Sequence, residues 1–156
     1  MRGVVVSDSS ALIALERIGQ IDLLSRLLAK VIIPPAVAQE VGPSVAGLTW
    51  IEERHLSRPI DRGVAAASLG PGESEVISLA LELRPYRVIL DDQPARGLAK
   101  RLGLPVIGLL GLLRAAKRQS VVTEVRPILD ALVVSGFRLS PDLYEPLLAS
   151  VGESPA

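Results

Sequence analysis

The chain has 156 residues, 49% of them hydrophobic, and its 17 lysines and arginines balance its 17 aspartates and glutamates. This length fits one domain with its own core, and the absence of cysteine excludes disulfides, thiolate zinc sites and thiol nucleophiles. The single histidine, His55, argues against a Ser-His-Asp triad, so carboxylate chemistry remains. Because the net charge is zero, any nucleic-acid binding has to come from local basic patches.

Charges, prolines and glycines interrupt every apolar run before it reaches the roughly 18–20 residues that a membrane span needs. The first residues hold only Arg2 and a short valine run, without the apolar core and cleavage site of a signal peptide. We therefore expect a cytoplasmic protein without a membrane segment, whose apolar excess belongs to a sheet buried on both faces.

A buried strand that leads into a helix is predicted at the start of the chain. Val4–Val6 is a β-branched run, and the polar residues Ser7–Ser10 form a turn that opens a helix. Beyond it, the pattern predicts helices over 11–17, 21–29 and 36–41 and a strand over 31–33. Asp8 therefore stands at the carboxyl end of a strand, and Glu40 lies in the last turn of a helix, where the helix dipole disfavours an anion.

The pattern is weak over 44–67, where we expect a helix beginning within 48–51 and a strand over 55–60. After Gly70, it predicts helices over 73–83, 93–102, 108–118, 124–134 and 141–151 and strands over 87–90 and 106–107. Ser140 is expected to cap the last helix. The alternation of strands and helices predicts an α/β fold with a mostly parallel central sheet and helices on both faces.

Acidic residues stand where several of these elements begin or end. Asp8 and the pair Asp91-Asp92 each follow a strand, Glu73 opens a helix, and Glu40 closes one. Each has a structural alternative: capping for the aspartates, the helix dipole for Glu73, and a solvated surface for Glu40. Carboxylates gathered at one sheet edge repel one another, and Mg²⁺ or Mn²⁺ would offset that repulsion. Such a site favours phosphodiester hydrolysis.

Four segments carry these acids in order: Val-Ser-Asp8-Ser9-Ser10-Ala-Leu, Pro-Ala-Val-Ala-Gln-Glu40-Val, Leu-Gly-Pro-Gly72-Glu73-Ser-Glu-Val-Ile-Ser-Leu-Ala and Val-Ile-Leu-Asp91-Asp92-Gln-Pro-Ala-Arg96. Their order and spacing resemble the PIN-domain nucleases, a group that includes the VapC-type toxins of toxin–antitoxin pairs. The later segments Leu104-Pro-Val-Ile-Gly-Leu-Leu-Gly and Gly136-Phe-Arg-Leu-Ser are similar to a PIN-like branch known mainly as predicted nucleic-acid-binding proteins.

The resemblance implies a PIN-like Rossmannoid three-layer fold. It implies a single domain over 1–156, with a C-terminal helical extension from about residue 139. It also implies a Mg²⁺ or Mn²⁺ site, whose catalytic and metal-binding acids would be Asp8, Glu40, Glu73 and Asp92.

Two of these ligands have a neighbour that competes for the role. Asp91 stands beside Asp92 and is predicted as a further metal ligand. Glu75 competes with Glu73, because Glu73 stands where the family usually has aspartate. Ser9 or Ser10 is similar to the small hydroxyl residue that positions a metal-bound water or the scissile phosphate.

Basic residues follow the last acidic motif. Asp92, Arg96 and Lys100 are spaced four residues apart and share one helix face. We expect Arg96 and Lys100 to bind substrate phosphate, and the alternative is a solvated face or an ion pair with Asp92. A second candidate phosphate track is formed by Arg114, Lys117 and Arg118.

The sequence favours a metal-dependent endoribonuclease, and the resemblance adds the toxin of a toxin–antitoxin pair, with RNA and an antitoxin as partners. The alternative is a PIN-like module that binds RNA or a protein without cutting, favoured by the glutamate in the third motif. A phosphotransfer domain of the dehalogenase kind is disfavoured, because Ser10 stands where it needs an acid. The apolar runs at 109–113 and 133–134 suggest a homodimer or, equally, a core helix.

Overall fold

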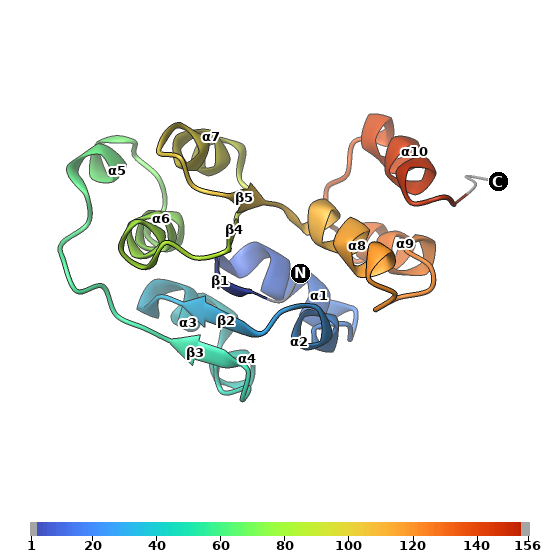
Figure 1. Ribbon diagram of the computed structural model, residues 1–156, viewed down its shortest axis with the longest axis horizontal. Coiled ribbons are helices and arrows are strands. Elements are labelled where there is room, and N and C mark those ends of the chain that lie inside the picture. Colours follow the sequence, from blue (N-terminus) through green and yellow to red (C-terminus); the bar gives the residue numbers. More distant parts are fainter. Residues whose placement is uncertain (1–2, 154–156) are drawn as a thin grey trace.

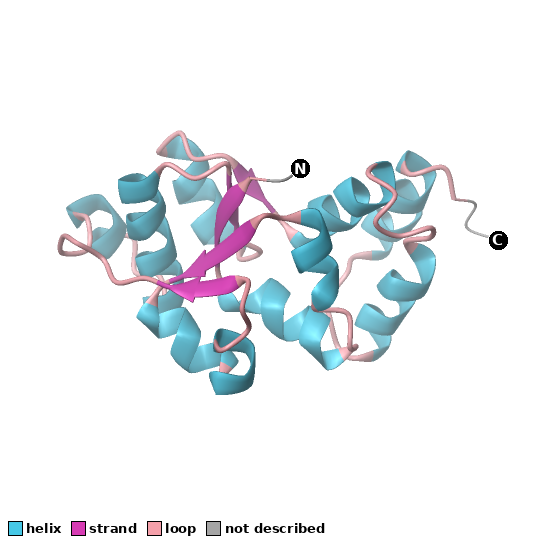
Figure 2. Cartoon of the chain, turned by 60° about the horizontal axis from the view of Figure 1, so that its bottom comes forward, coloured by secondary structure: helices cyan, strands magenta, loops and turns pink. Residues whose placement is uncertain are grey.

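A parallel sheet with helices on both faces organises the computed structural model, which describes residues 3–153 (Figures 1 and 2). Within this range the strands are β1 (Val4–Ser7), β2 (Lys30–Ile33), β3 (Ile51–Glu53), β4 (Arg87–Ile89) and β5 (Val106–Ile107). Their order across the sheet is β3-β2-β1-β4-β5, and each neighbouring pair is parallel. The predicted fold class is thereby confirmed.

The described helices connect these strands or follow them. They are α1 (Ser9–Arg17), α2 (Asp22–Leu27), α3 (Pro35–Val41), α4 (Pro43–Ala46), α5 (Arg62–Ala66), α6 (Pro71–Leu83), α7 (Gln93–Arg101), α8 (Leu109–Arg118), α9 (Arg126–Val134) and α10 (Pro141–Ser150). No helix in the described part of the chain combines the length and the apolar character needed to cross a membrane.

The valine run of β1 forms the centre of the core. Val5 and Val6 are fully buried, and they pair with Val31 and Ile32 of β2 on one side and with Arg87 and Val88 of β4 on the other. A continuous apolar run, without polar alternation, is typical of a parallel strand whose two faces are both covered. Here α6 packs against β1 and β4, and α1 packs against α3.

The sheet changes its direction of growth between β1 and β4. The chain first adds β2 and then β3 on one side of β1, and it then returns to place β4 and β5 on the other side. In open α/β sheets, the crevice outside the carboxyl ends of the strands at such a switch point is where ligands bind. The residues that follow β1 and β4 therefore lie at the position that this topology favours for a site.

The segment with the weak sequence pattern differs from the prediction. The helix expected within 48–51 and the strand expected over 55–60 are both wrong: α4 ends at Ala46, and the edge strand β3 comes before residue 55. Backbone at 54–61 is a loop, because Pro59 has no amide to donate and the Ser57 amide donates to the Glu82 carboxylate at 3.1 Å instead. The short helix α5, capped by the Asp61 side chain, was not predicted.

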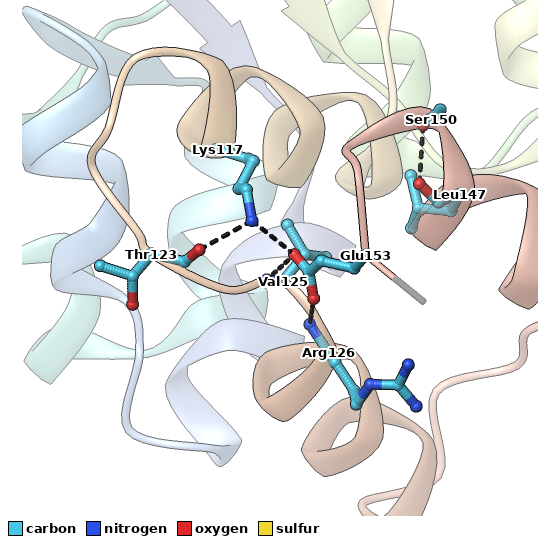
Figure 3. Close-up of polar contacts among 7 residues, drawn as sticks. All are labelled: Lys117, Thr123, Val125, Arg126, Leu147, Ser150 and Glu153. Carbon is cyan, nitrogen blue, oxygen red and sulfur yellow. Dashed lines mark hydrogen bonds and ion pairs between the residues drawn. The ribbon is translucent and has the colours of Figure 1, made fainter. Parts of the chain in front are cut away.

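Helices α8, α9 and α10 gather at one end of the molecule, beyond α1 and α2 (Figure 1). Glu153 fastens this group: its carboxylate accepts hydrogen bonds from the Val125 amide at 2.6 Å and the Arg126 amide at 3.0 Å, and it pairs with Lys117 at 3.1 Å (Figure 3). The two amides belong to the start of α9, which has no capping side chain of its own at Val125. We call this arrangement the Glu153 clasp.

The clasp is sheltered from water, since the Glu153 side chain is 10% exposed and that of Lys117 is 25% exposed. Burial raises the pKa of the Glu153 carboxyl, but the two amides and Lys117 outweigh that effect and hold the pKa below its usual value.

The Ser140 side chain accepts a hydrogen bond from the Asp142 amide at 3.3 Å, so the predicted cap of α10 is confirmed.

Candidate active site

Asp8 and Asp91 lie side by side at the switch point of the sheet. The Asp8 amide continues the pairing of β1 with β4 by donating to the Ile89 carbonyl at 3.0 Å. The Asp91 amide, two residues further along, donates to Oδ2 of Asp8 at 3.2 Å. Asp8 occupies the N-cap position of α1, yet its side chain makes no capping hydrogen bond. Its carboxylate accepts the Asp91 amide that follows the neighbouring strand, and the Ala11 amide of α1 is near enough to lower its pKa.

The Asp8 carboxylate is buried, with 4% of the residue exposed. Burial is the main reason why the pKa of Asp8 is raised to about 7, and the charges of Asp91 and Glu73 raise it further. Its Oδ1 atom is buried and has no hydrogen-bond partner among the described residues. The ionised form of Asp8 is thus poorly stabilised by the protein alone.

Asp91 is held in place from two sides. Its Oδ1 accepts the Leu109 amide, at the start of α8, at 3.1 Å, while Oδ2 is buried without a partner in the described chain. Burial raises the pKa of Asp91, and the Leu109 amide and the Arg96 guanidinium partly counteract this effect. Arg96 is itself fixed by a 2.9 Å hydrogen bond from its guanidinium to the Leu90 carbonyl.

Two of the competing acids serve as helix caps. Oδ2 of Asp92 accepts the Ala95 amide of α7 at 3.1 Å, and Asp92 is exposed. Glu75 accepts the Ala36 amide, in the first turn of α3, at 3.0 Å. Both carboxylates satisfy amides that a helix start leaves without an intrahelical partner. Asp91 also accepts a helix-start amide, that of Leu109, but unlike Asp92 it donates its own amide to Asp8. Of the two glutamates, Glu73 is the one whose charge raises the pKa of Asp8.

Glu40 joins α3 to the start of α1. Its Oε2 accepts a hydrogen bond from the Ser9 hydroxyl at 3.0 Å. Its Oε1 occupies the space where a side chain on Gly72 would begin, so the absence of a β-carbon at residue 72 lets α6 approach Glu40. Glu40 itself is exposed and does not line the cleft described below, although Ser9 does.

A cleft of about 920 Å³ opens beside Asp91. Its lining includes Ser9, Ser10, Glu73, Asp91, Asp92 and Arg96, which are six of the site residues predicted from the sequence. Lys100 is exposed on α7, outside this lining. We call the part of the cleft that holds Glu73 and Asp91 the acid end.

The second predicted phosphate track is divided in the structure. Arg114 lines the cleft, Lys117 belongs to the Glu153 clasp, and Arg118 is exposed elsewhere on α8. The three residues therefore do not act as one basic surface.

Sequence reasoning missed the other wall of the cleft. Arg17 at the end of α1 and Phe137 and Arg138 in the loop between α9 and α10 line it, together with apolar residues of α8 and α10. The helix dipole favours a basic residue in the last turn, so the position of Arg17 gave no reason to expect a functional role. Nothing in the local pattern of 137–138 indicates a cleft. Only the tertiary fold brings these segments together.

A divalent cation fits the Asp8–Asp91 pair by its chemistry. Among residues 3–153, no group of three or more acidic or histidine side chains is placed to hold a metal ion by itself. Mg²⁺, however, is commonly bound through one or two carboxylates, with waters and substrate phosphate completing its shell. The two buried oxygens that lack a partner, one on each aspartate, are donors of the required kind.

Comparisons with known proteins agree on the family. A family model described as a PIN domain (DUF3368) matches residues 4–153. Among solved structures, a PilT N-terminus domain protein from the hyperthermophilic archaeon Sulfolobus solfataricus P2 matches with a TM-score of 0.54 and 24% identity, over 72% of this chain and 92% of that one. No curated protein matches. The chain belongs to the PIN-domain family, generally a nuclease fold that uses divalent metal ions.

Proposed function

We propose that this protein is a metal-dependent endoribonuclease that hydrolyses RNA phosphodiester bonds at the acid end of the cleft. The observation that carries the proposal is the Asp8–Asp91 pair at the switch point: a buried and a half-buried carboxylate, each with one oxygen that lacks a hydrogen-bond partner among the described residues. Structural acids rarely leave such atoms unsatisfied, so this exception needs an explanation. A bound Mg²⁺ or Mn²⁺ supplies it.

In this proposal Asp8 and Asp91 hold the cation, and Glu73, whose charge raises the pKa of Asp8, lies at the same end of the cleft. When bound, the cation would lower the pKa of a coordinated water and neutralise charge on the phosphate. Arg96 and the Leu109 amide keep Asp91 in place.

Ser9 and Ser10 open α1 at the edge of the cleft. The positive end of the α1 helix dipole attracts phosphate oxygens to this edge of the cleft. Glu40 orients the Ser9 hydroxyl through their hydrogen bond. In this arrangement the serines position the scissile phosphate next to the two aspartates.

The test is cleavage of a panel of labelled single-stranded and structured RNAs by the purified protein with Mn²⁺ or Mg²⁺. We expect cutting that EDTA abolishes and that falls by about 10²-fold or more in Asp8→Asn and Asp91→Asn, as is typical when a group that stabilises transition-state charge is removed. Asp92→Asn is the matched control, because asparagine also caps helices and this variant should cut within about threefold of wild type. Equal losses in Asp91→Asn and Asp92→Asn would contradict the assignment of Asp91.

A second candidate function, a PIN-like module that binds RNA or a protein without cutting, is favoured by the lack of a third acid close to the pair in the described chain. It predicts no cleavage with either metal, no calorimetric signal for Mn²⁺, and RNA affinity that Asp8→Asn leaves unchanged.

Three further predictions from the sequence stand as part of the proposal. The first two are that the protein is a toxin restrained by an antitoxin and that it forms a homodimer. Co-purification with a partner protein would test the first, and the molecular mass in solution would test the second. We also propose that residues 1–156 form one domain with a C-terminal extension from about residue 139. The contacts of α10 with α8 and the Glu153 clasp support this division of the chain.

A further inference from the structure

Three arginines from distant parts of the sequence line the cleft, in addition to Arg96 near Asp91. Arg17 closes α1, Arg114 lies in α8, and Arg138 lies in the loop between α9 and α10. Within the described chain, no ion pair joins any of them to a carboxylate. We call the part of the cleft lined by these three arginines the arginine end.

A few basic residues of the described chain form ion pairs with carboxylates. Lys30 and Arg54 share Glu52, and Lys117 pairs with Glu153. Arg114, by comparison, has a buried Nε without a hydrogen-bond partner among the described residues. A buried donor without an acceptor costs free energy, and a ligand with anionic oxygens would remove that cost.

One face of α1 connects the two ends of the cleft. The cleft-lining residues of this helix are Ser9, Ser10, Ile13, Ala14 and Arg17. They recur at helical spacing, so they form a single stripe, and the helical rise of 1.5 Å per residue makes the stripe about 12 Å long. The stripe begins next to the catalytic candidates and ends at an arginine.

The middle of the cleft is apolar. Ile13, Ala14 and Leu110 face it, and Phe137 is the aromatic side chain among its lining residues. Aromatic rings and apolar surface stack against nucleic-acid bases, while arginines contact phosphates. The cleft therefore offers surfaces for both parts of a nucleotide, in addition to the acids.

We propose that the arginine end is a strand-binding subsite: Arg17, Arg114 and Arg138 bind phosphates of the nucleic-acid strand at a distance from the scissile bond, and Phe137 stacks on a base between them. A volume of about 920 Å³ accommodates a few nucleotides of a single strand. This subsite rests on the proposed function for its substrate class, but its residues are separate from the acids. They are positioning residues for the strand.

The experiment measures binding apart from cleavage. Fluorescence anisotropy in EDTA follows a 5′-fluorescein-labelled single-stranded RNA 12-mer titrated with wild type, Arg114→Ala, Arg138→Glu or Arg118→Ala. We expect five- to tenfold weaker binding for the first two variants. Each lost phosphate contact should also reduce the slope of log K against log salt by about 0.7. Arg118→Ala, an exposed arginine on the same helix but outside the cleft, is the matched control and should change affinity less than twofold.

Phe137→Leu separates the base contact from the phosphate contacts. It keeps an apolar side chain, and we expect about tenfold weaker binding of the RNA but unchanged binding of an abasic 12-mer of the same length. Arg138 is exposed in a loop, so the Arg138→Glu variant stays informative even if Arg114→Ala fails to fold.

The outcomes distinguish this inference from the proposed function. If the arginine variants bind as tightly as Arg118→Ala, with an unchanged salt slope, the subsite is overturned whether or not the wild type cuts RNA. If the arginine variants lose binding while the wild type shows no cleavage with Mn²⁺ or Mg²⁺, the subsite stands and the nuclease proposal fails. Loss of binding together with cleavage whose KM, and not kcat, rises in Arg138→Glu supports both.

Discussion

Glu153 and Asp8 are both largely removed from water, but the protein treats them in opposite ways. Glu153 receives two amides and a lysine, and its pKa is held below the usual value. Asp8 receives the Asp91 amide, has an oxygen without a partner among the described residues, and lies next to acids, so its pKa is raised to about 7. The comparison teaches that an acid that holds the fold together is fully satisfied, whereas the candidate catalytic acid is left incomplete.

Removing the satisfied acid should destabilise the protein more than any other substitution considered. Glu153→Ala leaves two helix-start amides without their acceptor and Lys117 with the Thr123 carbonyl, and we expect the free energy of unfolding to fall by about 3 kcal/mol. Urea denaturation monitored by circular dichroism measures this. Glu145→Ala, which removes an exposed glutamate of α10, is the control and should change stability by less than about 0.5 kcal/mol. Equal stabilities of the two variants would contradict the clasp.

The clasp should also fade in acid. Because the folded pKa of Glu153 lies below its ordinary value of 4.5, its contribution is present above that pH and is lost as the pH falls through the folded value. The stability difference between wild type and Glu153→Gln should therefore shrink below about pH 4, and a constant difference down to pH 2 would assign it to packing instead.

Neutralising the unsatisfied acid should stabilise the protein. Asp8 has an ordinary pKa of 3.8 and a folded pKa of about 7, so wild-type stability is fully present below the first value and declines as the pH rises through the second. Asp8→Asn removes this penalty, and we expect it to be more stable than wild type at pH 8 by on the order of 2–4 kcal/mol, with no gain at pH 3.

Two controls sharpen this measurement. Asp92→Asn should show no such pH-dependent gain, since that residue is exposed. Mn²⁺ should raise the Tm of the wild type and leave that of Asp8→Asn unchanged, because a ligand stabilises only a state that binds it. If the stability of the wild type does not decline between pH 4 and pH 8, Asp8 is not a poorly stabilised acid in the folded protein.

Glu73 and Glu75, near the start of α6, should differ in the same way. Glu75→Gln weakens the hydrogen bond to the Ala36 amide, and we expect it to lower stability by about 1 kcal/mol without changing the cleavage rate per folded molecule. Glu73→Gln should do the reverse, lowering metal-dependent cleavage by tenfold or more at unchanged Tm. Thermal unfolding and single-turnover cleavage of both variants measure these effects. A loss of cleavage in Glu75→Gln and a loss of stability in Glu73→Gln would show that Glu75 is the acid of the site.

The smallest effect is expected at Gly72. A methyl group there meets the Glu40 carboxylate, which is exposed and free to turn away, so Gly72→Ala should cost about 1 kcal/mol at most. In a double-mutant cycle, Glu40→Ala should remove most of this cost, because the two residues are in contact. Additive effects would show that the substitution acts elsewhere.

The strands and the acids that follow them could be read from the sequence because their signal is local. The valine run before Asp8 and the run before Asp91 mark buried strands, and parallel strands bring their carboxyl ends to one edge. The choice between Asp91 and Asp92 could not be made, since adjacent residues point to different sides and only the contact with the Leu109 amide shows which faces inward. The loop at 54–61 was mistaken for a strand because its bonds to Glu82 are long-range.

Of the arginine end, the sequence indicated only Arg114, and it grouped Arg114 with Lys117 and Arg118. Arg17, Arg114 and Arg138 are separated by long stretches of chain, and each has an ordinary place on a helix end, a helix or a loop. Their common cleft depends on how α8 and α10 pack, which no periodicity encodes.

The cleft joins residues near the start of the chain to residues near its end, and this has a consequence for the order of synthesis. Asp8 and Asp91 leave the ribosome before Arg138 and Glu153, by several seconds at roughly 5–20 residues per second. Until Glu153 emerges, the start of α9 lacks the acceptor that fastens it. In a nascent chain, the residues of the acid end are therefore present before Arg138, which completes the proposed binding site for a nucleic-acid strand.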